Sequence, residues 1–158
     1  MTIYYLLVLV LVIIDQITKY LTVTNIPLGE TVPFIEGFMS FTFVKNTGAA
    51  FSILEGKMWL FYIVTIIAII VIVYFMQTEG KQSKLAAIGL SFLLAGAIGN
   101  FIDRLLHQYV VDMIQLEFMD FAIFNLADTW ITIGVVIFII YLLFFDETDE
   151  KESVEHER

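Results

Sequence analysis

Asp112 and Asp128 are acidic residues set among apolar neighbours, in the stretches YVVDMI and FNLAD. Neither has a basic residue beside it in the sequence. Ionisable residues in or next to membrane segments are costly and usually functional. Two carboxyl groups that share one proton can hydrolyse a peptide bond, because the ionised group draws a proton from water while the protonated group polarises the carbonyl. The two aspartates are therefore candidates for an aspartic-peptidase dyad that titrates as a unit.

Other polar residues recur at helical spacing inside apolar segments. Asp15 and Lys19 are four residues apart, so they share a helix face and can pair. In GNFIDR, Asn100 lies three residues before Asp103 and four before Arg104. Side chains at these spacings are neighbours on a helix surface. The pattern predicts two helices that each carry a small polar group on one face.

Several of these residues also have purely structural interpretations. Asn125 lies three residues before Asp128, at the start of an apolar run, where Asn caps a helix and an acid suits its dipole. Asp15 and Lys19 are compatible with a satisfied ion pair at the membrane interface. Arg104 is compatible with an anchor whose head reaches the interface. The small residues around Gly96 are best explained by close helix packing in lipid.

The composition predicts an integral membrane protein whose helices position these side chains. The chain has 158 residues, of which 59% are hydrophobic and 16% charged. A spanning helix needs about 20 mostly apolar residues. Four windows qualify and predict an all-α, four-transmembrane-helix bundle; they are residues 3–21, 58–76, 85–106 and 128–145.

Alternation of the four helices gathers the polar residues at one membrane face. At about 1.5 Å per residue, Asp15 lies roughly 18 Å along the first helix and Asn100 roughly 22 Å along the third. The long connection 22–57 lies on the same side, and its segment FMSFTFVKN (38–46) is typical of a strand. We expect a small extracytoplasmic β-element there, followed by a lid-like segment, NTGAAFSIL (46–54), that turns at Gly48.

The net charge of −9 is concentrated at one end of the chain. Residues 146–158 contribute −5, which leaves −4 for residues 1–145, the expected membrane-embedded domain. We expect the acidic segment to be a disordered cytoplasmic tail. The first apolar segment lacks a preceding basic residue and a small-residue cleavage site, which favours a retained helix over a cleaved signal peptide. The sequence has no basic patch, so nothing in it indicates a nucleic-acid partner.

The residue inventory narrows the chemistry further. The sequence has no cysteine and two histidines, and it lacks an HExxH spacing, so we expect no metal site and no cofactor. A proton-coupled transporter is an alternative, because acidic and basic residues also build proton relays. However, a transport path should carry polar residues at both ends of the bundle. A structural four-helix subunit is a third possibility, which leaves the two unpaired acids without a role.

Five short motifs occur in order and resemble those of the bacterial signal peptidase II family, the lipoprotein signal peptidases. They are DQITK (15–19), NTGAAF (46–51), GAIGNFIDR (96–104), VVD (110–112) and FNLAD (124–128). The resemblance implies a membrane aspartic endopeptidase with Asp112 and Asp128 as its catalytic dyad. By motif position, further residues would bind substrate or support the site; they are Asp15, Lys19, Asn46, Gly48, Asn100, Asp103, Arg104 and Asn125. Asp103 is expected to act by pairing with a cation.

The resemblance also implies a substrate and a location. The substrate would be a lipidated prolipoprotein, cleaved just before its diacylglyceryl-cysteine, and globomycin-type inhibitors would occupy the same site. The enzyme would contact membrane lipid as a multi-pass protein of the bacterial plasma (inner) membrane, with its site facing outward. Basic residues outside the bundle number four on the side of the termini and two on the other side, which favours cytoplasmic termini.

Overall fold

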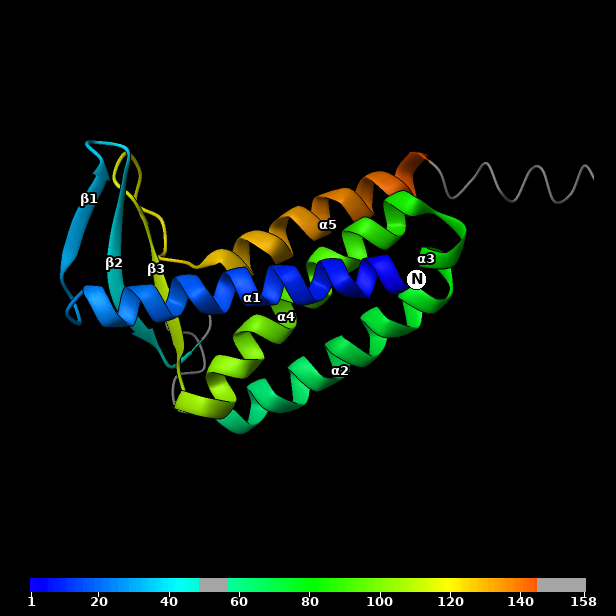
Figure 1. The fold of residues 1–158 in the computed structure, drawn as a ribbon, viewed down its shortest axis with the longest axis horizontal. Helices are drawn as coiled ribbons and strands as arrows, with labels where there is room; N and C mark the ends of the chain where they lie inside the picture. The colour runs from blue at the N-terminus through cyan, green and yellow to red at the C-terminus, as the bar shows by residue number, and fades with distance from the viewer. Residues whose placement is uncertain (49–56, 145–158) are drawn as a thin grey trace, which may run out of the picture.

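Four long helices form the body of the protein (Figure 1). The computed structural model describes residues 1–48 and 57–144. The long helices are α1 (Thr2–Asn25), α2 (Met58–Gln77), α4 (Lys84–His107) and α5 (Leu126–Phe144). By length and composition each can cross a membrane, so the four predicted spans are confirmed to within a few residues. The short helix α3 (Glu79–Gln82), in the connection between α2 and α4, was not predicted.

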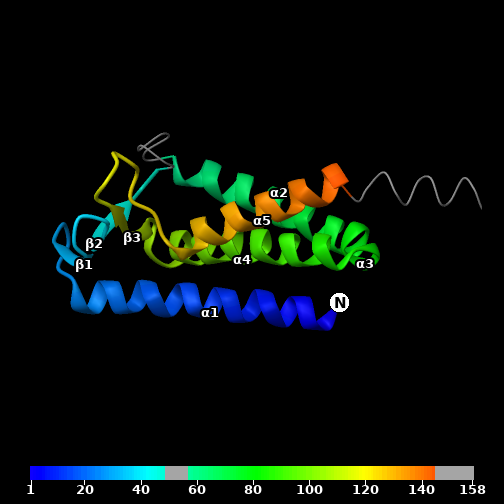
Figure 2. The same ribbon diagram turned by 90° about the horizontal axis from the view of Figure 1, so that it is seen from above.

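Helix α4 is the central helix of the bundle. Figure 2 shows α1 along one side of α4 and α2 on the opposite side. Glycines allow α4 and α5 to approach closely: a Cβ atom at Gly96 would collide with the carbonyl oxygen of Ala127, and one at Gly134 would lie 2.6 Å from the Leu93 nitrogen. Small residues are the usual device for tight helix packing in lipid. The packing role expected for this stripe is confirmed.

Apolar side chains fill the bundle and also cover its outside. A buried cluster that includes Val8, Leu11, Met76 and Leu94 joins α1, α2 and α4. Large aliphatic side chains on the outer helix faces are exposed, as at Ile70, which is 63% exposed. Such a surface suits a hydrocarbon environment, in which helices satisfy their own backbone hydrogen bonds.

A three-stranded antiparallel sheet covers one end of the bundle. Its order is β1 (Thr31–Ile35), β2 (Met39–Asn46) and β3 (Val110–Leu116). Strand β2 confirms the strand predicted over 38–46. Strands β1 and β2 confirm the small β-element expected in the first outer connection, and the third strand, β3, which was not predicted, comes from the connection between α4 and α5. Backbone pairing of Val44 with Asp112, and of Asn46 with Val110, brings the two outer connections together.

Two expected features fall on parts of the chain that the structure does not describe. The lid-like segment predicted over 46–54 lies outside the described residues beyond Gly48, and so does the acidic tail predicted over 146–158. The division into a membrane domain, 1–145, and a tail stays a prediction.

Candidate active site

Asp112 lies on β3, with its carboxyl group held by two amides. Its Oδ1 accepts a hydrogen bond from Asn125 Nδ2 at 2.7 Å, and its Oδ2 accepts one from Asn46 Nδ2 at 2.9 Å. The side chain is buried. Burial raises the pKa of Asp112 to about 6; the nearby Asp128 charge adds to this, and the Asn46 and Asn125 amides oppose it by stabilising the ionised form.

Asp128 lies in the first turn of α5, where the chain caps the helix. Its backbone N–H donates to Asn125 Oδ1 at 3.0 Å, and its Oδ2 accepts from the Asn125 backbone N–H at 3.2 Å. This reciprocal arrangement is a capping box. The other carboxyl oxygen, Oδ1, accepts from Asn100 Nδ2 at 2.8 Å. The predicted N-cap role of Asn125 is confirmed, and the same residue also contacts Asp112.

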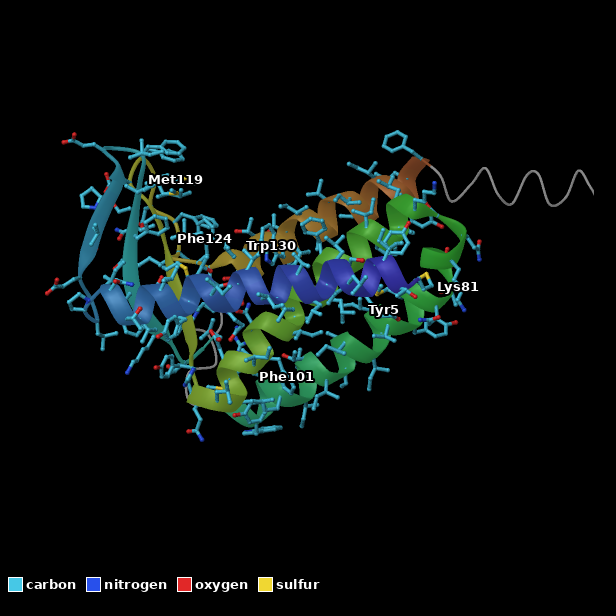
Figure 3. All side chains as sticks on the ribbon, in the orientation of Figure 1. Tyr5, Lys81, Phe101, Met119, Phe124 and Trp130 are labelled. Carbon is cyan, nitrogen blue, oxygen red and sulfur yellow. The ribbon has the colours of Figure 1, made fainter. Side chains whose placement is uncertain are left out.

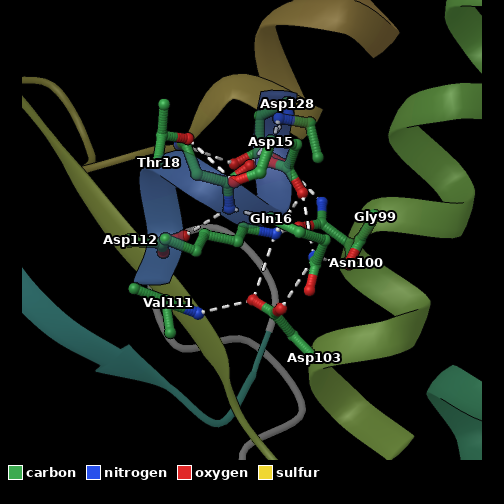
Figure 4. Close-up of polar contacts among 12 residues, drawn as sticks. Asp15, Gln16, Thr18, Gly99, Asn100, Asp103, Val111, Asp112 and Asp128 are labelled. Atoms are coloured by element: carbon green, nitrogen blue, oxygen red, sulfur yellow. Dashed lines mark hydrogen bonds and ion pairs between the residues drawn. The ribbon is translucent and has the colours of Figure 1, made fainter. Parts of the chain in front are cut away.

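Two asparagines join the aspartates into one chain of hydrogen bonds. Asn125 Nδ2 donates to Asn100 Oδ1 at 3.1 Å as well as to Asp112. The order of contacts is thus Asp112, Asn125, Asn100 and Asp128. Figure 4 shows both aspartates and Asn100 within this polar cluster, between β3, α4 and α5. Both carboxyl groups also line a cavity of about 700 Å³.

A buried ion-pair network supports the site from α1. Lys19 Nζ lies 3.0 Å from Asp15 Oδ2 and 3.0 Å from Asp103 Oδ2, and it donates to Asn100 Oδ1 at 3.1 Å. The predicted pairing of Asp15 with Lys19, and of Asp103 with a cation, is confirmed. All four side chains are buried. Buried charges of this kind are stable only when they are paired and hydrogen-bonded.

The two carboxylates of this network also hold the elements that carry the dyad. Asp15 Oδ1 accepts a hydrogen bond from the backbone N–H of Ala127 at 2.9 Å, one residue before Asp128. Asp103 Oδ2 accepts from the backbone N–H of Val111 at 3.0 Å, one residue before Asp112. The ion pairs therefore fix the backbone next to each catalytic candidate, a role beyond the interfacial pairing considered from sequence.

Gln16 belongs to the same network and was missed. Its Nε2 donates to Asp15 Oδ2 at 3.2 Å, to Asp103 Oδ1 at 3.1 Å and to the Gly99 carbonyl at 3.2 Å (Figure 4). The available signal was its place beside Asp15 in a long apolar segment. Helical spacing did not find it, because adjacent residues do not share a face.

Arg104 lies at the cavity wall. Its guanidinium is 4.6 Å from the Phe61 ring centroid, and Nη2 donates to the Gly48 carbonyl at 3.4 Å. The Gly48 N–H in turn donates to Asn46 Oδ1 at 2.9 Å. Tyr62, which was not predicted, donates its hydroxyl to the Arg104 carbonyl at 2.9 Å. Arg104 therefore lines the same cavity as the two aspartates instead of reaching away from the bundle.

The structure brings every predicted site residue into one connected region at the sheet end of the bundle. Within residues 1–48 and 57–144, no group of three or more His, Cys, Asp or Glu side chains is placed to hold a metal ion. The cavity has a mixed lining: the two aspartates and Arg104 contribute polar groups, and α2 and α5 contribute apolar residues such as Val64, Ala68 and Ile131.

Comparisons with known proteins agree with this geometry. The family described as signal peptidase (SPase) II matches residues 7–144. The lipoprotein signal peptidase of Enterococcus faecalis is 53% identical over 97% of this chain and 94% of its own length. That of Listeria monocytogenes serotype 4a is 47% identical over 94% of this chain and 97% of its own.

Two solved structures, both described as bacterial membrane enzymes, have the same fold. One has a TM-score of 0.87 and 43% identity, covering 90% of this chain and 88% of that one. The other has a TM-score of 0.85 and 42% identity, covering 92% of this chain and 95% of that one. The resemblance and the fold class predicted from sequence are confirmed. The chain belongs to the signal peptidase II family, and it is an aspartic-type membrane peptidase.

Proposed function

We propose that this protein removes the signal peptide from diacylglyceryl-modified prolipoproteins, with Asp112 and Asp128 as its catalytic dyad. The bond cleaved is the one just before the lipidated cysteine. The observation that carries the proposal is the chain of hydrogen bonds from Asp112 through two asparagines to Asp128, on the wall of one cavity. Membership of a signal peptidase family supplies the reaction class.

In this mechanism the dyad shares one proton. The ionised carboxyl group takes a proton from water as the water oxygen bonds to the scissile carbonyl carbon, and the protonated group donates to the carbonyl oxygen. When the C–N bond breaks, the dyad returns a proton to the leaving amine. The pKa of Asp112, raised to about 6 by burial, keeps part of its population protonated near neutral pH. The macroscopic titration belongs to the pair.

The surrounding side chains would hold the dyad and the peptide in place. Asn46, Asn100 and Asn125 donate to carboxyl oxygens, so they orient these oxygens. Arg104 stands on the same cavity wall, where its guanidinium would bind peptide carbonyls of the substrate. Such positioning makes the attack on the bound peptide effectively unimolecular.

The apolar part of the cavity supports a lipid-bearing substrate. Most of its wall comes from α2, α5 and the connection before α5, which belong to or adjoin membrane spans. A substrate with acyl chains would enter sideways from the bilayer, while its peptide would reach the two aspartates. A globomycin-type inhibitor would compete for this cavity. We place the cavity on the outer side of the bacterial plasma membrane, with both termini in the cytoplasm.

The transporter alternative is not favoured. The polar cluster lies at one end of the bundle, and the apolar cluster of Val8, Leu11, Met76 and Leu94 occupies the interior of α1, α2 and α4 away from it. The match to signal peptidase II likewise favours hydrolysis.

The test is a cleavage assay with purified protein in liposomes. The substrates are one prolipoprotein in two forms, with and without the diacylglyceryl group, and the readouts are a gel shift and the N-terminal residue of the product. We expect the lipidated form to be cut just before its modified cysteine and the unmodified form to remain intact. Absence of cleavage by folded protein would overturn the proposed function, and equal cleavage of both forms would overturn the proposed substrate.

A further inference from the structure

Six large apolar side chains are exposed together at the far end of the sheet. We call them the apolar tip; they are Phe34, Ile35, Phe38, Phe118, Met119 and Phe121. Each is between 46% and 61% exposed. Phe34 and Ile35 end strand β1, and Phe38 lies in the turn between β1 and β2. The other three come from the connection between β3 and α5. Apolar patches of this kind on protein surfaces usually mark an interaction site.

Ring contacts join members of the apolar tip to one another and to neighbouring aromatic residues. The rings of Phe38 and Phe118 stack with centroids 5.0 Å apart, and the Glu117 N–H donates to the Phe38 carbonyl at 3.0 Å. The Phe121 ring packs edge-on against the Phe124 ring, with centroids 5.8 Å apart. Figure 3 shows Met119 at the outer end of this region, beyond Phe124.

The apolar tip lies beside the membrane-facing surface of the bundle. Phe121 lines the same cavity as Thr129 and Thr132, which belong to the first two turns of α5. Phe121 therefore lies beside the start of α5, a helix long and apolar enough to cross a membrane. The lipid-facing side of α5 continues with exposed aliphatic residues such as Val136 and Ile139. Through Phe121 the apolar tip therefore adjoins a helix whose outer face is apolar and exposed.

The charges around the apolar tip indicate whether a membrane contact would be electrostatic or apolar. Residues 27–43 and 114–125, which include the apolar tip, contain four acidic residues and no lysine or arginine. One of the acids, Glu117, accepts hydrogen bonds from the Gly37 N–H and the Ser40 hydroxyl, so its charge is engaged within the sheet. Attraction to anionic headgroups cannot drive the contact. Burial of aromatic and aliphatic surface at the boundary between headgroups and acyl chains can drive it.

We propose that the apolar tip inserts into the lipid leaflet around the active-site end of the bundle and anchors the sheet to the membrane surface. This inference goes beyond the proposed reaction and does not depend on it. Its consequence is geometric. Phe118 and Met119 lie two and three residues after the end of β3, and β3 carries Asp112, so the anchor would hold that strand at a fixed height relative to the leaflet.

The absence of cysteine allows a direct test by single-site spin labelling. A nitroxide is attached at Met119→Cys in the full chain, reconstituted in liposomes at low protein density. Two matched labels serve as references. A label at Ile139→Cys, on the exposed face of α5, reports the lipid environment, and a label at Lys81→Cys, in the exposed connection after α2, reports the aqueous environment. Collision with oxygen, which is enriched in lipid, is compared with collision with a water-soluble nickel complex.

We expect the label at residue 119 to behave like the one at residue 139, at a depth of roughly 5–10 Å below the headgroup boundary. Adding Phe38→Ser and Phe118→Ser should move it toward the water-like ratio of residue 81. A water-like ratio in the starting protein would overturn the proposal. Low collision with both reagents would also overturn it, as would spectral broadening that grows with protein density, since these indicate cover by protein or by a second copy.

Discussion

Replacing Asn46 by alanine should move the alkaline limb of the pH–rate profile. Asn46 lies on β2, and its Nδ2 donates to Asp112 Oδ2 at 2.9 Å. This hydrogen bond favours the ionised carboxylate, so it lowers a pKa that burial raises to about 6. Its removal therefore raises the pKa of Asp112 further.

The size of the change follows from the strength of one hydrogen bond to a charged group. Such a bond contributes about 1.5–3 kcal/mol, and one pH unit corresponds to about 1.36 kcal/mol. Asn46 is only partly buried, so water replaces part of the lost bond and the lower end applies. We expect the alkaline limb to move upward by about one pH unit.

The assay measures kcat/KM for a lipidated prolipoprotein in detergent between about pH 5 and pH 9. This range extends roughly two pH units to either side of neutrality and covers the alkaline limb of the pH–rate profile. Activity requires one protonated carboxyl group, so a higher pKa preserves relatively more activity on the alkaline side. Asn25→Ala is the matched control, because the Asn25 amide donates only within its own exposed helix end, to the Leu21 carbonyl and Thr24 hydroxyl. A limb that stays in place, or moves to lower pH, would refute the assignment of Asn46 to Asp112.

Two further predictions concern the framework around the dyad. Gly96→Ala should destabilise the protein by about 1–3 kcal/mol, because the new Cβ would collide with the Ala127 carbonyl oxygen. Gly80→Ala should be nearly neutral, because its Cβ would make ordinary contacts at 3.5 Å and beyond. Equal thermal midpoints for the two variants in detergent would contradict this prediction. Lys19→Met should destabilise by about 3–5 kcal/mol, because two buried carboxylates lose their cation. A thermal midpoint equal to that of the wild type would show that the ion pairs do not hold the site.

The helices were predictable because their signal is local. Each span is a long apolar run, and its composition decides the structure before any tertiary contact forms. The site residues on α1 and α4 followed from helical spacing plus depth, which placed Asp15, Lys19 and Asn100 on faces that meet in the structure. Alternation of four spans was enough to bring them to the same end.

The missed features depend on tertiary pairing or on contacts outside one helix face. Strand β3 is seven residues long and contains Asp112, so its apolar pattern resembled a connection until β2 supplied its hydrogen-bonding partner. Gln16 lies off the face shared by Asp15 and Lys19, and it contacts the site through Asp103 and the Gly99 carbonyl of α4. The hydrogen bonds from the Val111 and Ala127 backbone N–H groups to carboxylates could not be predicted from the sequence, because no sequence pattern indicates them.

The central claim is that Asp112 and Asp128 act together as the hydrolytic dyad. The most direct measurement is the single-turnover cleavage rate of a lipidated prolipoprotein by the wild type, by Asp112→Asn, by Asp128→Asn and by the double variant, each shown to be folded by its helical circular dichroism and thermal midpoint. We expect each single variant to lose at least about 10³-fold in rate and the double variant to lose little more, because the two groups act as a unit. A folded single variant that keeps a rate near that of the wild type would contradict the dyad.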